Sequence, residues 1–259
     1  MNSRLYDFSL IIACYADAPH LFARVQTLAR YFAALTLRTE FIFVEDASPL
    51  NDKAEIERCL DFLRSTTISA KAIYHSQNQG RGRTVQDGFE ASEAEIVGFI
   101  DIDLEHSYDA LLTMIQKIQD RECEGIVGTR VLGAASTSVL RSVLSHGYRT
   151  LVHSVLPLPV PDTESGLKLF LRAPLLTVLP HIQDKQWFWD TEIVYRAQVM
   201  GLRIQHHEIV FRRDPSKKST VLPFRDSIRY LRTLFRFRLD LGREQHMVKE
   251  LPRLEGRRL

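Results

Sequence analysis

Acidic residues at alternate positions follow a short apolar segment near the middle of the chain. Residues 96–100, Ile-Val-Gly-Phe-Ile, are apolar and partly β-branched, which predicts a buried strand. Asp101, Asp103 and Glu105 follow at a spacing of two, so in an extended chain their side chains point to the same side. Ligands bind at the carboxyl ends of strands in open α/β sheets. A hard divalent cation, Mg²⁺ or Mn²⁺, would relieve the repulsion between these carboxylates and could hold a diphosphate.

A solvated loop or a helix N-cap explains the same acidic residues, because aspartate is favoured in both places. For an isolated Asp-x-Asp that explanation is the better one. The strand before the segment and the helix after it make metal binding equally plausible, so the rest of the chain has to decide.

Composition places the chain among ordinary globular proteins. It has 259 residues with 45% hydrophobic and 25% charged side chains, enough for one large α/β domain or two small ones. The net charge of +2 gives no sign of a nucleic-acid partner. Cys14, Cys59 and Cys123 lack CxxC spacing, which indicates a reducing compartment and no zinc site. The sequence shows neither a signal-peptide layout nor an apolar segment of bilayer length, so we expect a cytoplasmic protein.

Strand and helix patterns alternate along the chain. This alternation predicts an α/β fold with a mainly parallel central sheet, flanked by helices and joined by right-handed crossovers. The expected strands are residues 8–15, 40–44, 71–75, 96–100, 125–128, 167–171 and 203–211. The expected helices lie between residues 21 and 35 and at 52–65, 84–92, 109–121 and 187–200.

A glycine loop, Gly80-Arg81-Gly82, precedes the helix expected at 84–92. It is not a dinucleotide-binding fingerprint, because it lacks the third glycine and does not follow the first strand. With Arg81 and Arg83 at a helix start it could hold a phosphate, and a plain tight turn is an equally good explanation.

Basic residues after the fifth expected strand are candidates for an anion pocket. Arg130 follows that strand, and Arg141 and Ser145 are one helical turn apart and share a face. Judged by spacing alone, ordinary surface arginines explain them better. The turn at 162–166, Asp-Thr-Glu-Ser-Gly, brings further carboxylates just before a strand, and it too is explained as a plain turn.

Two tryptophans open the helix expected at 187–200. Trp187 and Trp189 would either belong to the core, which is the better explanation, or wall a sugar or lipid pocket. Asp190 is well placed as an N-cap.

The last expected helix begins at Pro223 and carries arginines beside apolar side chains. At about 100° per residue the arginines fall on one narrow stripe. Such a helix could pack on its own domain and also touch a membrane or a partner. A docked helix with solvated arginines is at least as good an explanation. The arginines are Arg225, Arg229, Arg232 and Arg236; Ile228, Leu231, Phe235 and Leu239 lie on one side of them, and Tyr230, Leu234 and Phe237 on the other.

The order of these motifs resembles family 2 glycosyltransferases of the GT-A fold, and within them the dolichol-phosphate mannose synthases and polyprenyl-phosphate glycosyltransferases. The similarity runs from Phe8 to Ser219. Its most specific part is residues 101–106, which resemble the family's Asp-x-Asp-Leu-Gln-His with Glu105 in the glutamine position. The resemblance implies a GT-A type catalytic domain at residues 1–222, followed by a C-terminal amphipathic helix and tail at residues 223–259.

The resemblance implies a nucleotide-sugar site. Residues 45–48 resemble the family's Asp-Asp-x-Ser, in which Asp46 would contact the donor nucleotide. Residues 78–82 resemble Asn-x-Gly-Lys-Gly with arginine for lysine, and residues 12–17 resemble a Pro-x-Tyr-Asn-Glu type of motif with three substitutions. The implied donor-binding residues are Ala13, Tyr15, Asp17, Asp46, Gly80, Arg81, Asp101, Ile102 and Asp103, and the implied ligands of Mg²⁺ or Mn²⁺ are Asp101, Asp103 and Glu105.

It also implies an acceptor site. Gly128-Thr129-Arg130, followed by Arg141 and Ser145, resembles the residues that hold the acceptor lipid's phosphate. Residues 162–166 resemble the family's Asp-x-x-x-Gly turn near the acceptor. The implied phosphate-binding residues are Arg130, Arg141, Ser145, Arg213 and Lys217, and the implied catalytic residues are Asp101, Asp103, Arg141 and Asp162.

The activity implied is that of a metal-dependent, inverting hexosyltransferase. It would move a sugar from a GDP- or UDP-sugar to a polyprenyl phosphate, as a cytoplasmic protein peripheral to the membrane. One alternative is a saccharide hydroxyl acceptor, which needs a base such as Asp162, Glu164 or Asp190. Another is a non-catalytic subunit that binds sugar nucleotides; the alanines at positions 13 and 16 favour it, and the intact Asp-x-Asp argues against it.

Overall fold

The structure is a computed structural model that describes residues 5–102, 104–105, 108–132, 147, 149–213 and 229–241. Its strands are β1 (Tyr6–Cys14), β2 (Thr39–Glu45), β3 (Ser69–Tyr74), β4 (Ala94–Ile100), β5 (Leu104–Glu105), β6 (Gly125–Leu132), β7 (Leu167–Leu171) and β8 (Ile204–Arg213). Its helices are α1 (Ala18–Ala33), α2 (Asp52–Leu63), α3 (Arg81–Ala91), α4 (Tyr108–Gln119), α6 (Arg172–Val178) and α7 (Trp189–Val199), with a 3₁₀ turn at Leu179–His181 and helical residues at 149–155 and 229–241.

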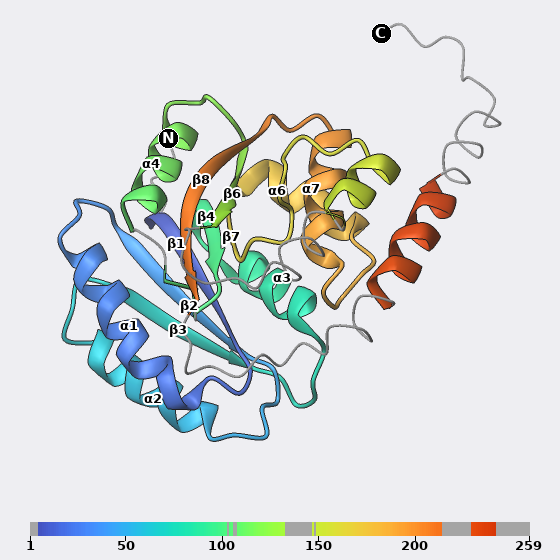
Figure 1. Ribbon diagram of the computed structural model, residues 1–259. Coiled ribbons are helices and arrows are strands. Elements are labelled where there is room, and N and C mark those ends of the chain that lie inside the picture. The colour runs from blue at the N-terminus through green and yellow to red at the C-terminus, as the bar shows by residue number, and fades with distance from the viewer. Residues whose placement is uncertain are drawn as a thin grey trace, which may run out of the picture.

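One twisted sheet runs through the molecule in the order β3-β2-β1-β4-β7-β6-β8-β5 (Figure 1). The pairs β1–β2, β2–β3, β1–β4 and β6–β8 are parallel, whereas β7 runs antiparallel to both β4 and β6. The mainly parallel sheet predicted from the alternation of strands and helices is therefore confirmed, with β7 and the short β5 as the strands that run the other way.

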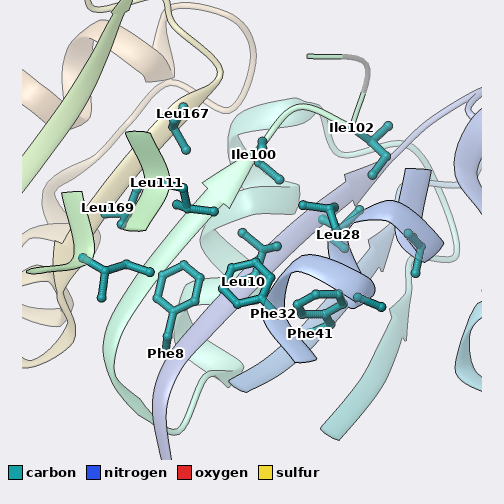
Figure 2. Packing of buried hydrophobic residues seen from close by; sticks show 14 of the residues in the cluster. Phe8, Leu10, Leu28, Phe32, Phe41, Ile100, Ile102, Leu111, Leu167 and Leu169 are labelled. Carbon is teal, nitrogen blue, oxygen red and sulfur yellow. The ribbon is translucent and has the colours of Figure 1, made fainter. Parts of the chain in front are cut away.

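Both faces of the sheet are buried, because helices cover each of them. Successive side chains of a central strand point to opposite sides and so enter two separate cores. In β1, Phe8, Leu10 and Ile12 pack with α1, α2 and α4, while Ile11 packs on the opposite face with α3, α6 and α7 (Figures 1 and 2). α1 shows why the helices form where they do: its buried Leu21, Val25, Leu28 and Phe32 recur at helical spacing, and a proline stands in its first turn.

The helix at residues 229–241 is docked on the rest of the molecule. Tyr230, Leu234 and Phe237 are buried against Phe188 and Tyr195, at and just before α7. The Tyr230 hydroxyl lies 2.5 Å from Thr191 Oγ1, which lies 2.7 Å from Thr163 Oγ1. A buried row of hydroxyls thus joins this helix to the turn at 162–166. The predicted division at residue 222 falls outside the described residues.

Candidate active site

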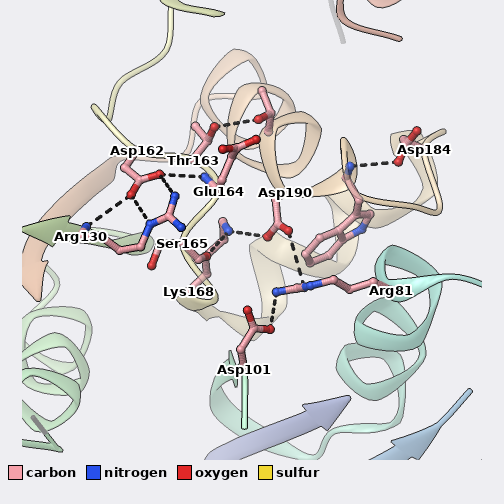
Figure 3. A network of polar contacts seen from close by, with 12 residues as sticks. Arg81, Asp101, Arg130, Asp162, Thr163, Glu164, Ser165, Lys168, Asp184 and Asp190 are labelled. Atoms are coloured by element: carbon pink, nitrogen blue, oxygen red, sulfur yellow. Dashed lines mark hydrogen bonds and ion pairs between the residues drawn. The ribbon is translucent and has the colours of Figure 1, made fainter. Parts of the chain in front are cut away.

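The carboxyl ends of β1, β2 and β4 meet at one edge of the sheet, and Asp101 follows β4 directly. β7 begins at the same place because it is antiparallel: Ile100 pairs with Leu167, and the Asp101 N–H donates to the Gly166 carbonyl at 2.8 Å. The acidic turn at 162–166 therefore lies beside Asp101, as Figure 3 shows. Residues that are about 60 positions apart in the chain form one polar site.

Arg81 connects Asp101 to a second, more deeply buried carboxylate. Its guanidinium donates to Asp101 Oδ1, and its other terminal nitrogen lies 3.6 Å from Asp190 Oδ2 (Figure 3). Asp190 in turn accepts a hydrogen bond from Lys168 Nζ at 2.5 Å. Lys168 is fully buried and also donates to the Ser165 carbonyl at 2.6 Å. Burial lowers the pKa of Lys168, and the negative charge of Asp190 opposes that change.

Asp162 forms ion pairs with two arginines, Arg130 and Arg149. It is buried, accepts from Arg130 Nε at 2.8 Å and Nη2 at 3.0 Å, and accepts from Arg149 Nη2 at 2.9 Å. Burial raises the pKa of Asp162, but the hydrogen bond and charge of Arg130, together with the charge of Arg149, outweigh it and leave the pKa below its usual value. A carboxylate held in this way is a poor general base, which weakens the role considered for Asp162 with a hydroxyl acceptor.

Asp46, expected to contact the donor nucleotide, organises the loop before α3. Its carboxylate accepts from the backbone N–H groups of Gln79 at 2.7 Å and Gly80 at 2.9 Å. His75 lies between Asp46 Oδ1, at 2.8 Å, and Asp87 Oδ2, at 3.0 Å. Asp46 therefore positions Gly80 and Arg81, and its direct contact with a nucleotide stays a prediction.

The start of α3 is a turn fixed to another loop. Gly80 has a φ of +94°, and the N–H groups of Gly82 and Arg83 both point at the Lys185 carbonyl, at 2.9 and 3.3 Å. Arg83 forms an ion pair with Asp87. A protein carbonyl therefore already accepts from these two amides, and phosphate binding by the loop stays a prediction. The anion-binding capacity of the loop rests on the Arg81 side chain.

The loop after β1 is held by its own carboxylate. Asp17 Oδ2 accepts from the Tyr15 N–H at 3.0 Å, while the Tyr15 ring is 48% exposed at this edge. Ala13 is partly buried against the core, and Ile102 is buried among core residues (Figure 2). Any donor contact of Ile102 would have to come from its backbone. The other expected donor contacts of this loop stay predictions.

The two tryptophans have different environments. Trp189 is fully buried, with its ring 5.6 Å from that of Phe99, so the core interpretation is correct for it. Trp187 is 48% exposed, and its ring lies 5.6 Å from the Arg81 guanidinium. The N-cap prediction for Asp190 is wrong: α7 begins at Trp189, and the preceding residue makes no side-chain cap. Asp190 points inward because the buried Lys168 ammonium requires a counter-charge.

The side chains of several predicted site residues lie outside the described set. The backbones of Glu105 and Arg213 pair β5 with β8, Glu105 opposite Arg212 and Leu104 opposite Arg213, but their side chains lie outside the described set. Whether they meet ligands stays a prediction. The following residues lie wholly outside the described residues: Asp103, Arg141, Ser145 and Lys217.

Three residues of the site were not expected from the sequence: Lys168, Arg149 and His75. A lysine inside the apolar strand Leu-Lys-Leu-Phe-Leu was a usable signal for Lys168, because a strand covered on both faces has no polar side. Arg149 and His75 carry no local signal, since their partners are 12 residues or more away in the chain.

The donor chemistry at Asp101 suits a hard cation. Its carboxylate is partly exposed, 31%, and stands at a strand end where only oxygen ligands are expected. The described residues contain no cluster of three His, Cys, Asp or Glu side chains able to hold a metal. Of the three predicted ligands, only Asp101 has a described side chain.

Comparison with known proteins identifies the family. The family model described as glycosyl transferase family 2 matches residues 9–179, which include the site edge, the glycine loop and the acidic turn. The chain belongs to glycosyl transferase family 2. This family 2 chain is 26% identical to a dolichyl-phosphate beta-glucosyltransferase of Saccharomyces cerevisiae over 223 residues, covering 78% of the chain and 65% of the relative.

Two further similarities delimit the match. Glycosyltransferase AglD of Haloferax volcanii is 31% identical over 134 residues, covering 51% of the chain but 22% of that protein. The family 2 chain thus spans less than two thirds of these curated relatives. Glucosyl-3-phosphoglycerate synthase of Mycobacterium tuberculosis, crystallised with Mn²⁺ and UDP, superposes with a TM-score of 0.64 at 13% identity, covering 90% of the chain and 79% of that structure. This likeness confirms the GT-A type fold.

Proposed function

We propose that the protein is an inverting glycosyltransferase that moves a sugar from a nucleotide diphosphate sugar to a polyprenyl phosphate. The family match and the activity named for the yeast relative support it. One observation carries the choice of acceptor: two of the three candidate bases are already held by cations, Asp162 by Arg130 and Arg149, and Asp190 by Lys168. A saccharide hydroxyl needs a base, whereas a lipid phosphate is already anionic.

A divalent metal would be held by Asp101 and Asp103, with Glu105 as a third candidate. Bound there, Mg²⁺ or Mn²⁺ would neutralise the charge that builds up on the leaving diphosphate. The chain's own groups would orient the reactants: Arg81 at the diphosphate, and Arg130, Arg141 and Ser145 at the acceptor phosphate, with Arg213 and Lys217 as further basic candidates. Positioning of two bound reactants supplies much of the rate in such a transfer.

The acceptor is tested with Arg141→Ala. Loss of a charge-assisted hydrogen bond to phosphate costs roughly 1.5–3 kcal/mol, so kcat/KM for the polyprenyl phosphate should fall about tenfold or more. The donor KM should change little. The measurement is release of nucleoside diphosphate from GDP- and UDP-sugars, with polyprenyl phosphate varied at fixed donor.

Arg38→Ala is the matched control, because Arg38 pairs with Asp7 near the start of β1, at the opposite edge of the sheet. It should leave both KM values unchanged. Unchanged acceptor kinetics in Arg141→Ala would favour a hydroxyl acceptor instead, and donor binding without any turnover would favour a non-catalytic subunit.

The helix at 229–241 supports the proposal that the protein contacts a membrane surface. On its undocked side Phe235 is 50% and Leu239 66% exposed, and Arg232, Arg236 and Arg238 are exposed beside them. Apolar side chains among arginines suit an anionic lipid surface, where cations meet the head groups. Within the described part of the chain, no helix is both long and apolar enough to cross a bilayer.

The membrane proposal predicts salt-sensitive binding to vesicles that contain phosphatidylserine. Phe235→Ser with Leu239→Ser should reduce binding about tenfold or more, because burial of each large apolar side chain contributes roughly 1.5–3 kcal/mol. Co-sedimentation at low and high salt measures it. Exposed Val199→Ser, at the far end of α7, is the control. Equal binding by the double variant and the wild type would place the contact elsewhere.

A further inference from the structure

Arg81 stands where two ligands of opposite charge would have to meet. Its guanidinium contacts Asp101, the first predicted metal ligand, and lies 3.6 Å from Asp190. The aromatic rings of Phe99 and Trp187 lie 5.1 and 5.6 Å from it, as for a cation held against ring faces. Of these two carboxylates Asp101 is the more exposed, with 31% of its side chain accessible against 4% for Asp190.

The base of the Arg81 side chain is anchored, so a change of partner would involve the side chain alone. The Gly80 N–H donates to Asp46 at 2.9 Å, and the Gly82 N–H donates to the Lys185 carbonyl at 2.9 Å. A Cβ on Gly80 would come within 2.5 Å of the Lys185 carbonyl, which shows how closely the two loops pack. The guanidinium lies at the end of a long side chain, so a change of partner requires rotation of the side-chain torsions alone.

The charges of the site show which contact is replaceable. Asp190 keeps a counter-charge without Arg81, because Lys168 Nζ lies 2.5 Å from its other oxygen. Asp101, in contrast, pairs with Arg81 at the partly exposed side of the site. A divalent cation on Asp101 would bring positive charge toward the guanidinium, while a diphosphate would attract it.

We propose that Arg81 is an exchangeable counterion: it occupies Asp101 while no donor is bound, and it moves to the diphosphate when Asp101 takes the metal. The proposal rests on the proposed function only in taking a divalent metal and a nucleoside diphosphate as ligands. It makes their binding interdependent. Metal alone has to displace Arg81, whereas metal with diphosphate offers Arg81 a new partner.

Arg81→Gln tests the exchange by two affinities that should change in opposite directions. The Kd for Mn²⁺ without nucleotide, from the electron paramagnetic resonance of free Mn²⁺, should fall about tenfold, within the range of 5 to 150-fold typical of coupled sites. The Kd for UDP and for GDP at saturating Mn²⁺, from calorimetry, should rise about tenfold. A variant that was merely damaged would lose affinity for both.

Arg83→Gln is the matched control, because Arg83 is two residues away and pairs with Asp87. It should leave both affinities unchanged. Arg81→Lys keeps the charge but not the fork that reaches two carboxylates, so it should also bind Mn²⁺ more tightly than wild type, and it carries the test if Arg81→Gln does not fold. The proposal is overturned if neither Arg81 variant binds Mn²⁺ more tightly. Failure to transfer sugar to polyprenyl phosphate would overturn the acceptor assignment and leave these titrations unaffected.

Discussion

Asp101→Asn is expected to lower kcat for sugar transfer by about a thousandfold or more. The carboxylate stands directly after β4 at the ligand edge, and the substitution removes the negative charge of one of the two proposed principal ligands of the metal. A metal contributes several kcal/mol to stabilising charge on a leaving group, and about 4 kcal/mol corresponds to three powers of ten in rate. Chelation of divalent metal should have the same effect, and added Mn²⁺ or Mg²⁺ should reverse it in the wild type but not in the variant.

Turnover would be measured as donor-dependent release of nucleoside diphosphate. Asparagine has the shape of aspartate and still offers an oxygen to Arg81, so thermal unfolding should change little. Asp61→Asn is the matched control, because Asp61 is an exposed residue on α2 that pairs with Arg64. Full activity in chelator would overturn the metal assignment.

Lys168→Met should destabilise the fold by about 3–5 kcal/mol. Lys168 is fully buried and Asp190 nearly so, and removal of one partner leaves the other charge in the interior without adequate compensation. Arg81 remains 3.6 Å from Asp190 and offsets part of this loss. Urea unfolding measures the change as a lower midpoint at an unchanged slope.

The double variant Lys168→Met, Asp190→Asn should regain part of the lost stability, because the buried charge is then absent. The control is Arg64→Gln, which breaks the exposed Arg64–Asp61 pair and should cost less than about 1 kcal/mol. Additive losses in the double variant would show that Lys168 and Asp190 do not act as a pair.

The local sequence pattern was enough to predict most strands of the sheet and the helices that cover it. β1, β2 and β4 contain apolar runs, and α1 and α4 keep their apolar side chains at helical spacing. The direction of β7 was not readable, because a strand has the same side-chain pattern in either direction. α6 was missed because seven residues with a proline at the third position are too short to show a period.

Some residues of the site could likewise be predicted from local sequence, and others could not. Asp101 was predictable because its place follows from the strand just before it. The pairs Arg81–Asp101 and Lys168–Asp190 join residues 20 and 22 positions apart, and the bond from Arg130 to Asp162 spans 32, so no spacing rule for a helix or strand applies to them. Asp190 illustrates this. The local pattern predicted a helix N-cap, but the carboxylate instead pairs with the buried ammonium of Lys168 on β7.

The row of hydroxyls from Tyr230 through Thr191 to Thr163 has a mechanical consequence. If the exposed side of the last helix rests on a bilayer, this row and the packing of Phe237 on α7 make a strut of fixed length between the lipid surface and the turn beside Asp101. The height at which a lipid head group must present its phosphate is then set by the protein. The protein would then select acceptors by the distance of their phosphate from the bilayer surface. The length of the lipid tail inside the bilayer would have little effect.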